Sequence, residues 1–239
     1  MSAITRLFEG KQQMFIECAN VPYASARVES FLDLALNVKG AKTLQRSFDE
    51  YVAEELMTGS NQCRAVDEEK GVDFGLQDAR KGVRFLRFPQ VLQIQLKRFD
   101  WCYETMKACT VDGRFEFPVS LDLTQMEWGE EDEAEGEGEA AGEGKDAAPE
   151  RPRARKPIDP LDPAIYHLHS VLVHRGSISD GRYSAFVRPF VDDPAAGYED
   201  SPWLKFNDET VSICADAREA PRRISAASTS MCSIVWARR

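Results

Sequence analysis

Apolar and polar residues alternate at period two in several segments, and this pattern constrains the fold more than any other feature. Successive side chains of a strand point to opposite faces, so such segments predict strands with one buried face. The segments are residues 15–21, where the alternation is weak, Leu32, Leu34, Leu36 and Val38 on one face, Val91, Ile94 and Leu96 before Lys97, residues 166–173, and a closing strand over residues 231–236.

A helical repeat lies between the early strands. Leu44, Phe48, Tyr51, Val52 and Leu56 recur at helical spacing, with Thr43 as the N-cap and Gly59 just beyond the end. The apolar face of this segment predicts a core helix. Helix and strands together predict an α+β fold dominated by an antiparallel sheet.

Acidic residues are concentrated in one tract. Residues 127–146 hold ten acids and one lysine, a local charge of −9 in a chain whose net charge is −10, so the remainder is nearly neutral. Low apolar content predicts a disordered insertion over residues 127–157, interpreted as a solvated connection between two strands. Its basic end, residues 151–156, leaves open a nuclear-import or interaction patch. Nothing in the tract indicates nucleic-acid binding by the folded part.

Composition excludes other classes of protein. No apolar run is long enough to span a membrane, and the first residues lack a signal-peptide pattern, which predicts a cytoplasmic or nuclear protein. The cysteines at 18, 63, 102, 109, 214 and 232 show no close paired spacing, which favours reduced thiols over a disulfide framework.

Two phrases in the last third of the chain carry the clearest chemical signal. The first runs Val171-Leu-Val-His-Arg-Gly176 and continues with Gly181-Arg-Tyr-Ser-Ala-Phe186, and the second is Trp203-Leu-Lys-Phe-Asn-Asp208. They resemble the histidine box of the ubiquitin-specific proteases, in which Gly-His-Tyr carries the general base. By this resemblance Arg182 occupies the general-base position without being competent. Asn207 fits the position that orients the base, and Asp208 fits an assisting acid.

The resemblance covers residues 7–126 and 160–238 and is nearest to the herpesvirus-associated type. Phrases that carry it include Leu7-Phe-Glu-Gly-Lys11, Lys81-Gly-Val-Arg-Phe85, Gln95-Leu-Lys-Arg-Phe99 and Gly113-Arg-Phe-Glu-Phe-Pro118. It implies a fold of the papain-like cysteine-protease superfamily. Residues 1–239 then form a partial domain, the fingers and palm, interrupted by 127–157. The helical thumb with its cysteine box is missing, because no cysteine lies in a Gly-Asn-Thr-Cys-Tyr-like phrase.

The same resemblance implies a partner and excludes a metal. Phe99 and Tyr183 match positions that line the channel for the extended Gly-Gly tail of ubiquitin, so ubiquitin or a ubiquitinated protein is the predicted partner. No cofactor is expected. Cys18 and Cys63 retain only the first member of each Cys-x-x-Cys knuckle, and two ligands do not make a structural zinc site. We therefore expect metal-free fingers held by packing.

Arginine offers only hydrogen-bond donors and cannot shuttle a proton. The chain is therefore predicted to be a ubiquitin- or partner-binding pseudoenzyme of a deubiquitinase family, with little or no activity alone. Three alternatives stay open: a truncated half of an active deubiquitinase, a scaffold that does not bind ubiquitin, and His174 as a repurposed base. A missing lobe also predicts exposed apolar surface near residues 91–99 and 183–187.

Overall fold

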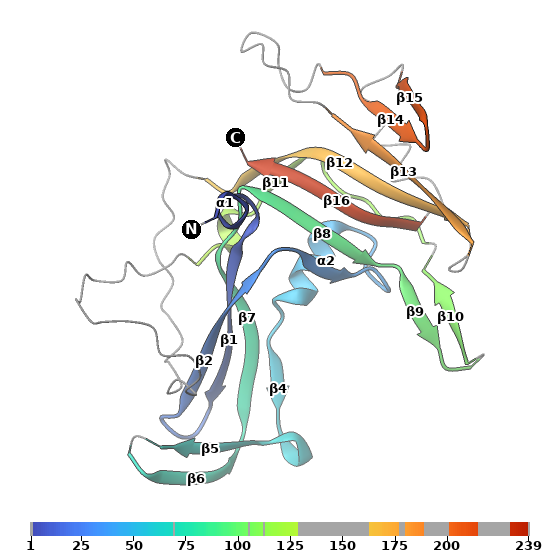
Figure 1. The fold of residues 1–239 in the computed structure, drawn as a ribbon. Helices are drawn as coiled ribbons and strands as arrows, with labels where there is room; N and C mark the ends of the chain where they lie inside the picture. The colour runs from blue at the N-terminus through green and yellow to red at the C-terminus, as the bar shows by residue number, and fades with distance from the viewer. Residues whose placement is uncertain are drawn as a thin grey trace.

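Two sheets dominate the computed structural model of this chain (Figure 1). An eight-stranded sheet has the order β15-β14-β13-β12-β16-β8-β3, with β11 paired to β12 off this path, and a four-stranded sheet has the order β2-β1-β7-β4. Two hairpins, β5-β6 and β9-β10, form separate two-stranded sheets. The structure describes residues 2–68, 70–104, 106–111, 113–128, 163–176, 180–188, 201–214 and 230–238.

The elements have the following bounds. The eight-stranded sheet contains β3 (Leu34–Asn37), β8 (Val91–Lys97), β11 (Ser120–Asp122), β12 (Ile165–Gly176), β13 (Gly181–Val187), β14 (Leu204–Asn207), β15 (Thr210–Ile213) and β16 (Ser230–Arg238). The four-stranded sheet contains β1 (Gly10–Cys18), β2 (Ala24–Phe31), β4 (Glu55–Met57) and β7 (Ala79–Arg87). The hairpins are β5 (Cys63–Asp67) with β6 (Val72–Gln77), and β9 (Phe99–Cys102) with β10 (Lys107–Thr110). The helical elements are α1 (Ala3–Phe8), α2 (Leu44–Tyr51) and the 3₁₀ turns η1 (Gly59–Asn61) and η2 (Thr124–Met126).

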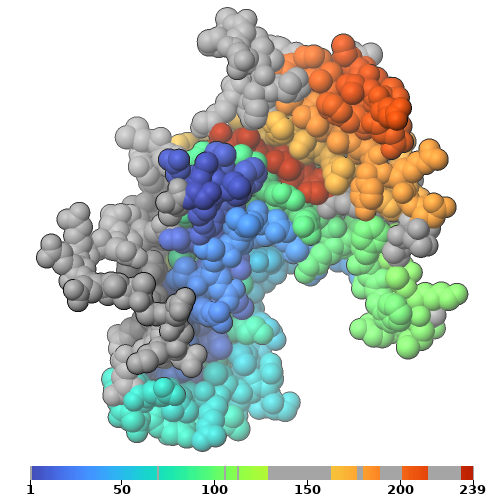
Figure 2. Space-filling view, viewed as in Figure 1, coloured from blue at the N-terminus to red at the C-terminus, as the bar shows by residue number. Residues whose placement is uncertain are grey.

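The four-stranded sheet projects downward from the eight-stranded sheet and ends in the β5-β6 hairpin (Figure 1). The β9-β10 hairpin projects on the other side of the molecule. In the space-filling view these two projections border an open hollow beneath the eight-stranded sheet (Figure 2). The described part of the chain is therefore shaped like an arch.

The helix α2 begins as the sequence predicts and ends earlier. Thr43 is its N-cap, and the Thr43 side chain accepts a hydrogen bond from the amide of Arg46 at 3.3 Å. The predicted extension to Leu56 is wrong, because Leu56 lies in β4 opposite Arg80 and is 72% exposed. Gly59, expected beyond the helix end, starts the turn η1 with a φ of 63°. Pairing of β4 with β7 overrides the helical spacing of this stretch.

Two predicted strand faces also differ from the structure. Leu34, Leu36 and Val38 share a buried face, but Leu32 is 55% exposed in the bend between β2 and β3. In β12, Tyr166 and Leu168 are buried as expected, and then the buried face changes to odd-numbered positions. The change follows a register shift between Leu168 and Ser170 in the pairing with β16, which exchanges the two faces of the strand.

A continuous hydrophobic core lies between the eight-stranded sheet, α2 and the top of the four-stranded sheet. Its largest buried side chains include Trp203, Trp236, Tyr166, Phe48, Phe85, Phe88 and Phe115. Strand β8 contributes Leu92, Ile94 and Leu96, whereas Val91 is only half-buried. The predicted closing strand is β16, which pairs with both β12 and β8 and so completes the sheet beneath the candidate site.

Candidate functional site

The histidine-box residues lie at one end of the antiparallel strands β12, β13 and β14. Arg182 is the second residue of β13, is exposed, and pairs with Arg175 of β12. Asn207 is the last residue of β14, and the β13-β14 pairing aligns Ala185 with Phe206. Because side chains alternate along paired strands, Arg182 and Asn207 lie on the same face of the sheet. The structure thus brings the two predicted positions to the same end of two neighbouring strands.

Asp208, predicted to be an assisting acid, has a conformational role in the structure. It follows Asn207 in a two-residue turn, since Asn207 pairs with Thr210, and its φ is 49°. Aspartate is one of the few residues other than glycine that tolerates this left-handed conformation. Asp208 is exposed. The acid at this position therefore helps to close the β14-β15 hairpin.

Phe99 and Tyr183, far apart in the sequence, are brought together around His174. The Phe99 and His174 ring centroids are 5.7 Å apart at an interplanar angle of 74°, and those of His174 and Tyr183 are 4.9 Å apart at 55°. Phe99 is 43% exposed and Tyr183 is 52% exposed, whereas His174 is 3% exposed. Neither aromatic side chain is buried in the core. Both contact a buried imidazole, and because side chains alternate along β13, Tyr183 points to the opposite face of the sheet from Arg182.

Arg98 and Asp100 fix the position of Phe99 between them. The buried guanidinium of Arg98 donates from Nη1 to the carbonyl oxygens of Val111 at 2.6 Å and Gly113 at 2.9 Å. Lys39 donates to Asp100 at 2.8 Å, and this hydrogen bond, with another from the Trp101 amide, lowers the pKa of the Asp100 carboxyl. In the Lys-Arg-Phe phrase, the Arg98 side chain is thus buried and hydrogen-bonded, whereas the Phe99 ring that follows it is exposed.

The β9-β10 hairpin carries further exposed apolar residues. Trp101, Tyr103 and Met106 are 46%, 82% and 68% exposed. Of the apolar residues within the ranges predicted to expose apolar surface, 91–99 and 183–187, only Phe99 and Tyr183 are exposed, whereas Leu92, Ile94 and Leu96 are buried. Exposed apolar residues gathered in one region are typical of an interaction surface.

Cys18 and Cys63 lie near each other at the far end of the four-stranded sheet. Cys18 pairs with Ala79 and Cys63 pairs with Gln77, so the two cysteines flank Asp78. Burial, and secondarily the neighbouring Cys63, raises the pKa of the Cys18 thiol. Both thiols are free and partly buried. Among the described residues there is no group of three or more His, Cys, Asp or Glu side chains that could hold a metal ion.

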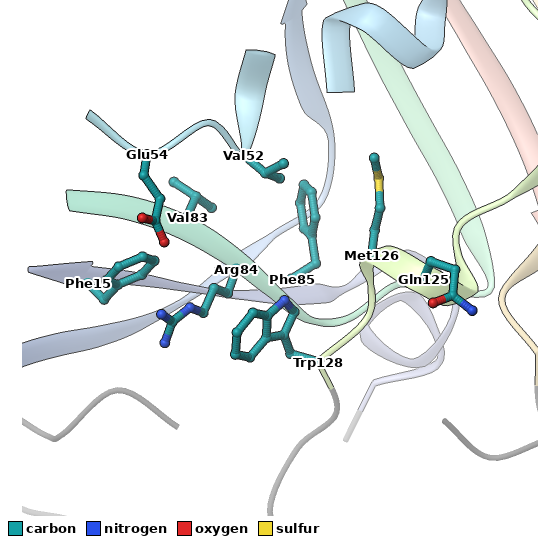
Figure 3. Close-up of a pocket in the computed structure, with 9 residues that line it drawn as sticks. All are labelled: Phe15, Val52, Glu54, Val83, Arg84, Phe85, Gln125, Met126 and Trp128. Carbon is teal, nitrogen blue, oxygen red and sulfur yellow. The ribbon is translucent and has the colours of Figure 1, made fainter. Parts of the chain in front are cut away.

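A pocket of about 190 Å³ lies beside β7, where the four-stranded sheet joins the core (Figure 3). It is lined by Phe15, Val52, Glu54, Val83, Arg84, Phe85, Gln125, Met126 and Trp128. The Arg84 guanidinium lies 3.8 Å from the Phe15 ring centroid and 4.3 Å from that of Trp128. None of the lining residues belongs to the Phe99, His174 and Tyr183 cluster, and none is a thiol or imidazole.

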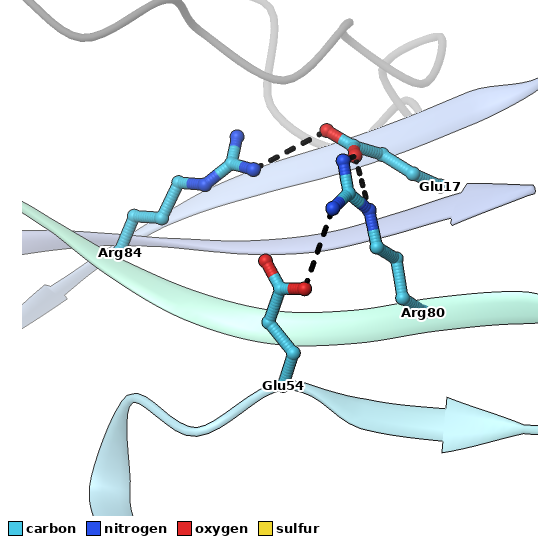
Figure 4. A network of polar contacts seen from close by, with 4 residues as sticks. All are labelled: Glu17, Glu54, Arg80 and Arg84. Carbon is cyan, nitrogen blue, oxygen red and sulfur yellow. Dashed lines mark hydrogen bonds and ion pairs between the residues drawn. The ribbon is translucent and has the colours of Figure 1, made fainter. Parts of the chain in front are cut away.

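Beside this pocket, a polar network joins two strands of the four-stranded sheet and the residue before a third (Figure 4). Arg80 Nε donates to Glu17 at 2.8 Å, and Arg80 also pairs with Glu54 at 3.4 Å. Arg84 pairs with the other oxygen of Glu17 at 3.3 Å. The network therefore links β1, β7 and the residue before β4 without involving the histidine-box edge.

Comparison with known proteins agrees with this geometry. The family model described as ubiquitin carboxyl-terminal hydrolase matches residues 1–230. The chain belongs to the ubiquitin carboxyl-terminal hydrolase family. It is 40% identical over 212 residues to ubiquitin carboxyl-terminal hydrolase 15 of Saccharomyces cerevisiae and 41% identical over 209 residues to ubiquitin C-terminal hydrolase 12 of Arabidopsis thaliana. Each match covers 87% of this chain, but only 14% and 15% of those relatives.

The fold also matches a solved member of the family. The SAGA Ubp8/Sgf11/Sus1/Sgf73 DUB module bound to ubiquitin aldehyde is 22% identical, with a TM-score of 0.68, and the match covers 99% of this chain and 42% of that chain. The predicted α+β, papain-like fold of a palm and fingers portion is therefore confirmed. We call the eight-stranded sheet the palm and the four-stranded sheet with β5-β6 the fingers.

Several features lie beyond what the structure describes. The acidic insertion predicted over 127–157 falls outside the described residues after residue 128, as do residues 177–179. No helix in the described ranges is long and apolar enough to cross a membrane. Sequence reasoning noted His174 only as a candidate base and did not place it under the aromatic pair. The contact of His174 with Tyr183 depends on the register of β12 against β13.

Proposed function

We propose that this chain is a ubiquitin-binding module of the deubiquitinase family that has little or no hydrolytic activity of its own. The observation that carries the proposal is the contrast between two adjacent residues. Tyr183 forms, with Phe99, an exposed aromatic pair suited to a narrow peptide channel, whereas Arg182 beside it stands where the family keeps its general base.

The binding part rests on shape and exposure. Phe99 and Tyr183 both contact His174, and a narrow channel lined by such rings would favour a tail made of glycine, because residues with side chains would not pass through it. The hollow between the fingers and the β9-β10 hairpin is open on one face of the molecule, as Figure 2 shows, and suits a globular partner. The solved relative in complex with ubiquitin aldehyde supports ubiquitin as that partner.

The catalytic part rests on the chemistry of Arg182. Thiol-dependent hydrolysis needs a base that takes the proton of the nucleophile and returns it to the leaving amine. A guanidinium donates hydrogen bonds only. Losing a general acid or base costs on the order of 10²- to 10⁴-fold in rate. Asn207 and Asp208 would then orient and assist a residue that cannot transfer a proton.

The remaining proposals concern context. Phrases such as Lys81-Gly-Val-Arg-Phe85 support placement nearest the herpesvirus-associated type. Cys18, Cys63, Cys102, Cys109 and Cys214 form no disulfide in the described part of the chain, which supports a cytoplasmic or nuclear location. The proposal includes no membrane or nucleic acid as partner. Because the chain spans about 15% of the length of the Arabidopsis relative, a second candidate is a portion of a longer hydrolase. In that setting Arg182 would still block proton transfer.

A chimera tests the catalytic proposal. The matching segment of the yeast relative is replaced by this chain, and hydrolysis of a fluorogenic ubiquitin C-terminal substrate is measured. We expect a loss of at least about 100-fold relative to the parent, and recovery on Arg182→His. Asp180→Asn, a change at an exposed residue just before β13, is the matched control and should not recover activity. Turnover near the parental rate with Arg182 in place would refute the proposal.

A further inference from the structure

His174 is the one titratable side chain that contacts both exposed aromatic rings of the candidate site in the described part of the chain. It lies on β12 directly opposite Tyr183 in the β12-β13 pairing. Phe99 approaches from β9, edge-on to the imidazole. A buried ring thus touches two rings that come from different strands and are each about half exposed.

Gly181 closes a third side of the imidazole. A Cβ built at Gly181 would lie 1.7 Å from Nε2 of His174 and 2.4 Å from its Cε1. No side chain fits at that distance, so the imidazole packs directly against the Gly181 backbone. Because Gly181 is the first residue of β13, this contact fixes where the strand starts and hence where Arg182 and Tyr183 lie.

A histidine at this place is costly for stability. Its Nδ1 is buried and has no hydrogen-bond partner among the described residues. Leaving such a group unsatisfied costs roughly 1–3 kcal/mol. An apolar side chain would avoid that cost while filling the same space. Stability alone therefore does not account for the imidazole, and its contacts with the aromatic pair do.

We propose that His174 is a positioning residue for the ubiquitin-tail channel: its imidazole, set against Gly181, holds Phe99 and Tyr183 at the orientation that admits an extended glycine tail. The inference rests on the proposed ubiquitin binding. It assigns His174 no proton transfer, in contrast to the open alternative of a repurposed base.

The test uses the full chain and two probes, labelled ubiquitin and labelled ubiquitin without its C-terminal Gly-Gly. The dissociation constant of the truncated ubiquitin divided by that of intact ubiquitin measures the contribution of the tail to binding, and we call this the tail ratio. We expect His174→Ala to reduce this ratio by roughly tenfold, since each aromatic contact contributes about 0.5–1.5 kcal/mol. His167→Ala, on the same strand but opposite Ala237, is the matched control and should leave the ratio unchanged.

A double-mutant cycle separates positioning from general destabilisation. If His174 acts through Tyr183, then His174→Ala should have little further effect on the ratio in a Tyr183→Ala background. If its role were only structural, both probes would lose affinity equally, and the losses would add. That result would overturn the inference.

A steric pair provides a second route should His174→Ala fold poorly. Gly181→Ala forces a collision with the imidazole and should reduce the tail ratio as His174→Ala does, while His174→Ser/Gly181→Ala should show no further loss beyond His174→Ser. Additive losses in the ratio would contradict the contact. If the wild-type chain binds both probes equally, the proposed function itself is contradicted.

If the wild-type chain prefers intact ubiquitin and this preference persists in His174→Ala and His174→Ser, only the present inference is contradicted.

Discussion

The palm and the fingers are held together in different ways. The palm has a continuous core, in which Trp236 and Trp203 are fully buried under paired strands. The fingers form a thinner sheet, joined by the network of Glu17, Arg80 and Arg84 and by the Arg84 stack. Of the exposed aromatic pair, Tyr183 lies on a strand of the palm, and Phe99 lies in β9 directly after the palm strand β8. The fingers depend on partly exposed polar contacts.

The largest effect should follow from opening the palm core. Trp236 is fully buried and packs edge-on to Phe117 at 6.2 Å between ring centroids. Trp236→Ala should lower the free energy of unfolding by roughly 3–5 kcal/mol, because it leaves a large cavity. Urea denaturation measures this. A loss below about 1 kcal/mol would mean that the palm is not the stable part.

A smaller effect is expected in the fingers. Arg84 is stacked between Phe15 and Trp128 and only 11% of its side chain is exposed. Arg84→Gln should cost roughly 1–2 kcal/mol, because the cation–π contacts and the pair with Glu17 are both lost. Lys81→Gln, which removes an exposed pair on the same strand, should cost less than about 1 kcal/mol. Equal costs for the two variants would show that the stack contributes nothing.

The smallest effect is a difference in pH dependence between the two sheets. Burial lowers the pKa of His169 in the palm. Below the ordinary histidine pKa of about 6.5 the unfolded chain binds more protons than the folded chain, so stability falls as pH decreases through that value. In the fingers, the hydrogen bond from Arg64 lowers the pKa of Asp73. That contribution is complete above about pH 4 and is lost only in stronger acid.

Thermal denaturation at pH 7.5, 6.5 and 5.5 compares these contributions. The three pH values are chosen to bracket the reference histidine pKa of about 6.5. His169→Gln should flatten the decline of the melting temperature toward pH 5.5, whereas Asp73→Asn should leave its slope unchanged over the same interval. A slope unaffected by His169→Gln would show that the palm imidazole does not set the neutral-range dependence.

The sequence predicts local features of this fold better than pairing between distant segments. The Thr43 cap depends on residues next to one another, and the structure confirms it. The exposure of Leu56 and the changed face of β12 follow from pairing with β7 and β16, which no local pattern specifies. Strict alternation over residues 166–173 would put Leu172 on the buried face of Tyr166 and Leu168, but Leu172 is exposed.

The candidate site shows the same division. Arg182, Asn207, Phe99 and Tyr183 were assigned from motifs, and the structure brings them to one end of the palm strands. The role of His174 required the register that sets it opposite Tyr183 and the approach of Gly181. Both are contacts across strands, so spacing along the chain could not indicate them.

The central claim is tail-dependent ubiquitin binding without hydrolysis, and one titration tests it most directly. Labelled ubiquitin, intact or without its C-terminal Gly-Gly, is titrated with the wild-type chain and with Tyr183→Ala. We predict saturable binding of intact ubiquitin, no release of fluorophore when a fluorogenic ubiquitin C-terminal substrate replaces it, and clear weakening of binding when either the tail or the Tyr183 ring is removed. Binding that is absent, or that is indifferent to both changes, would contradict the account.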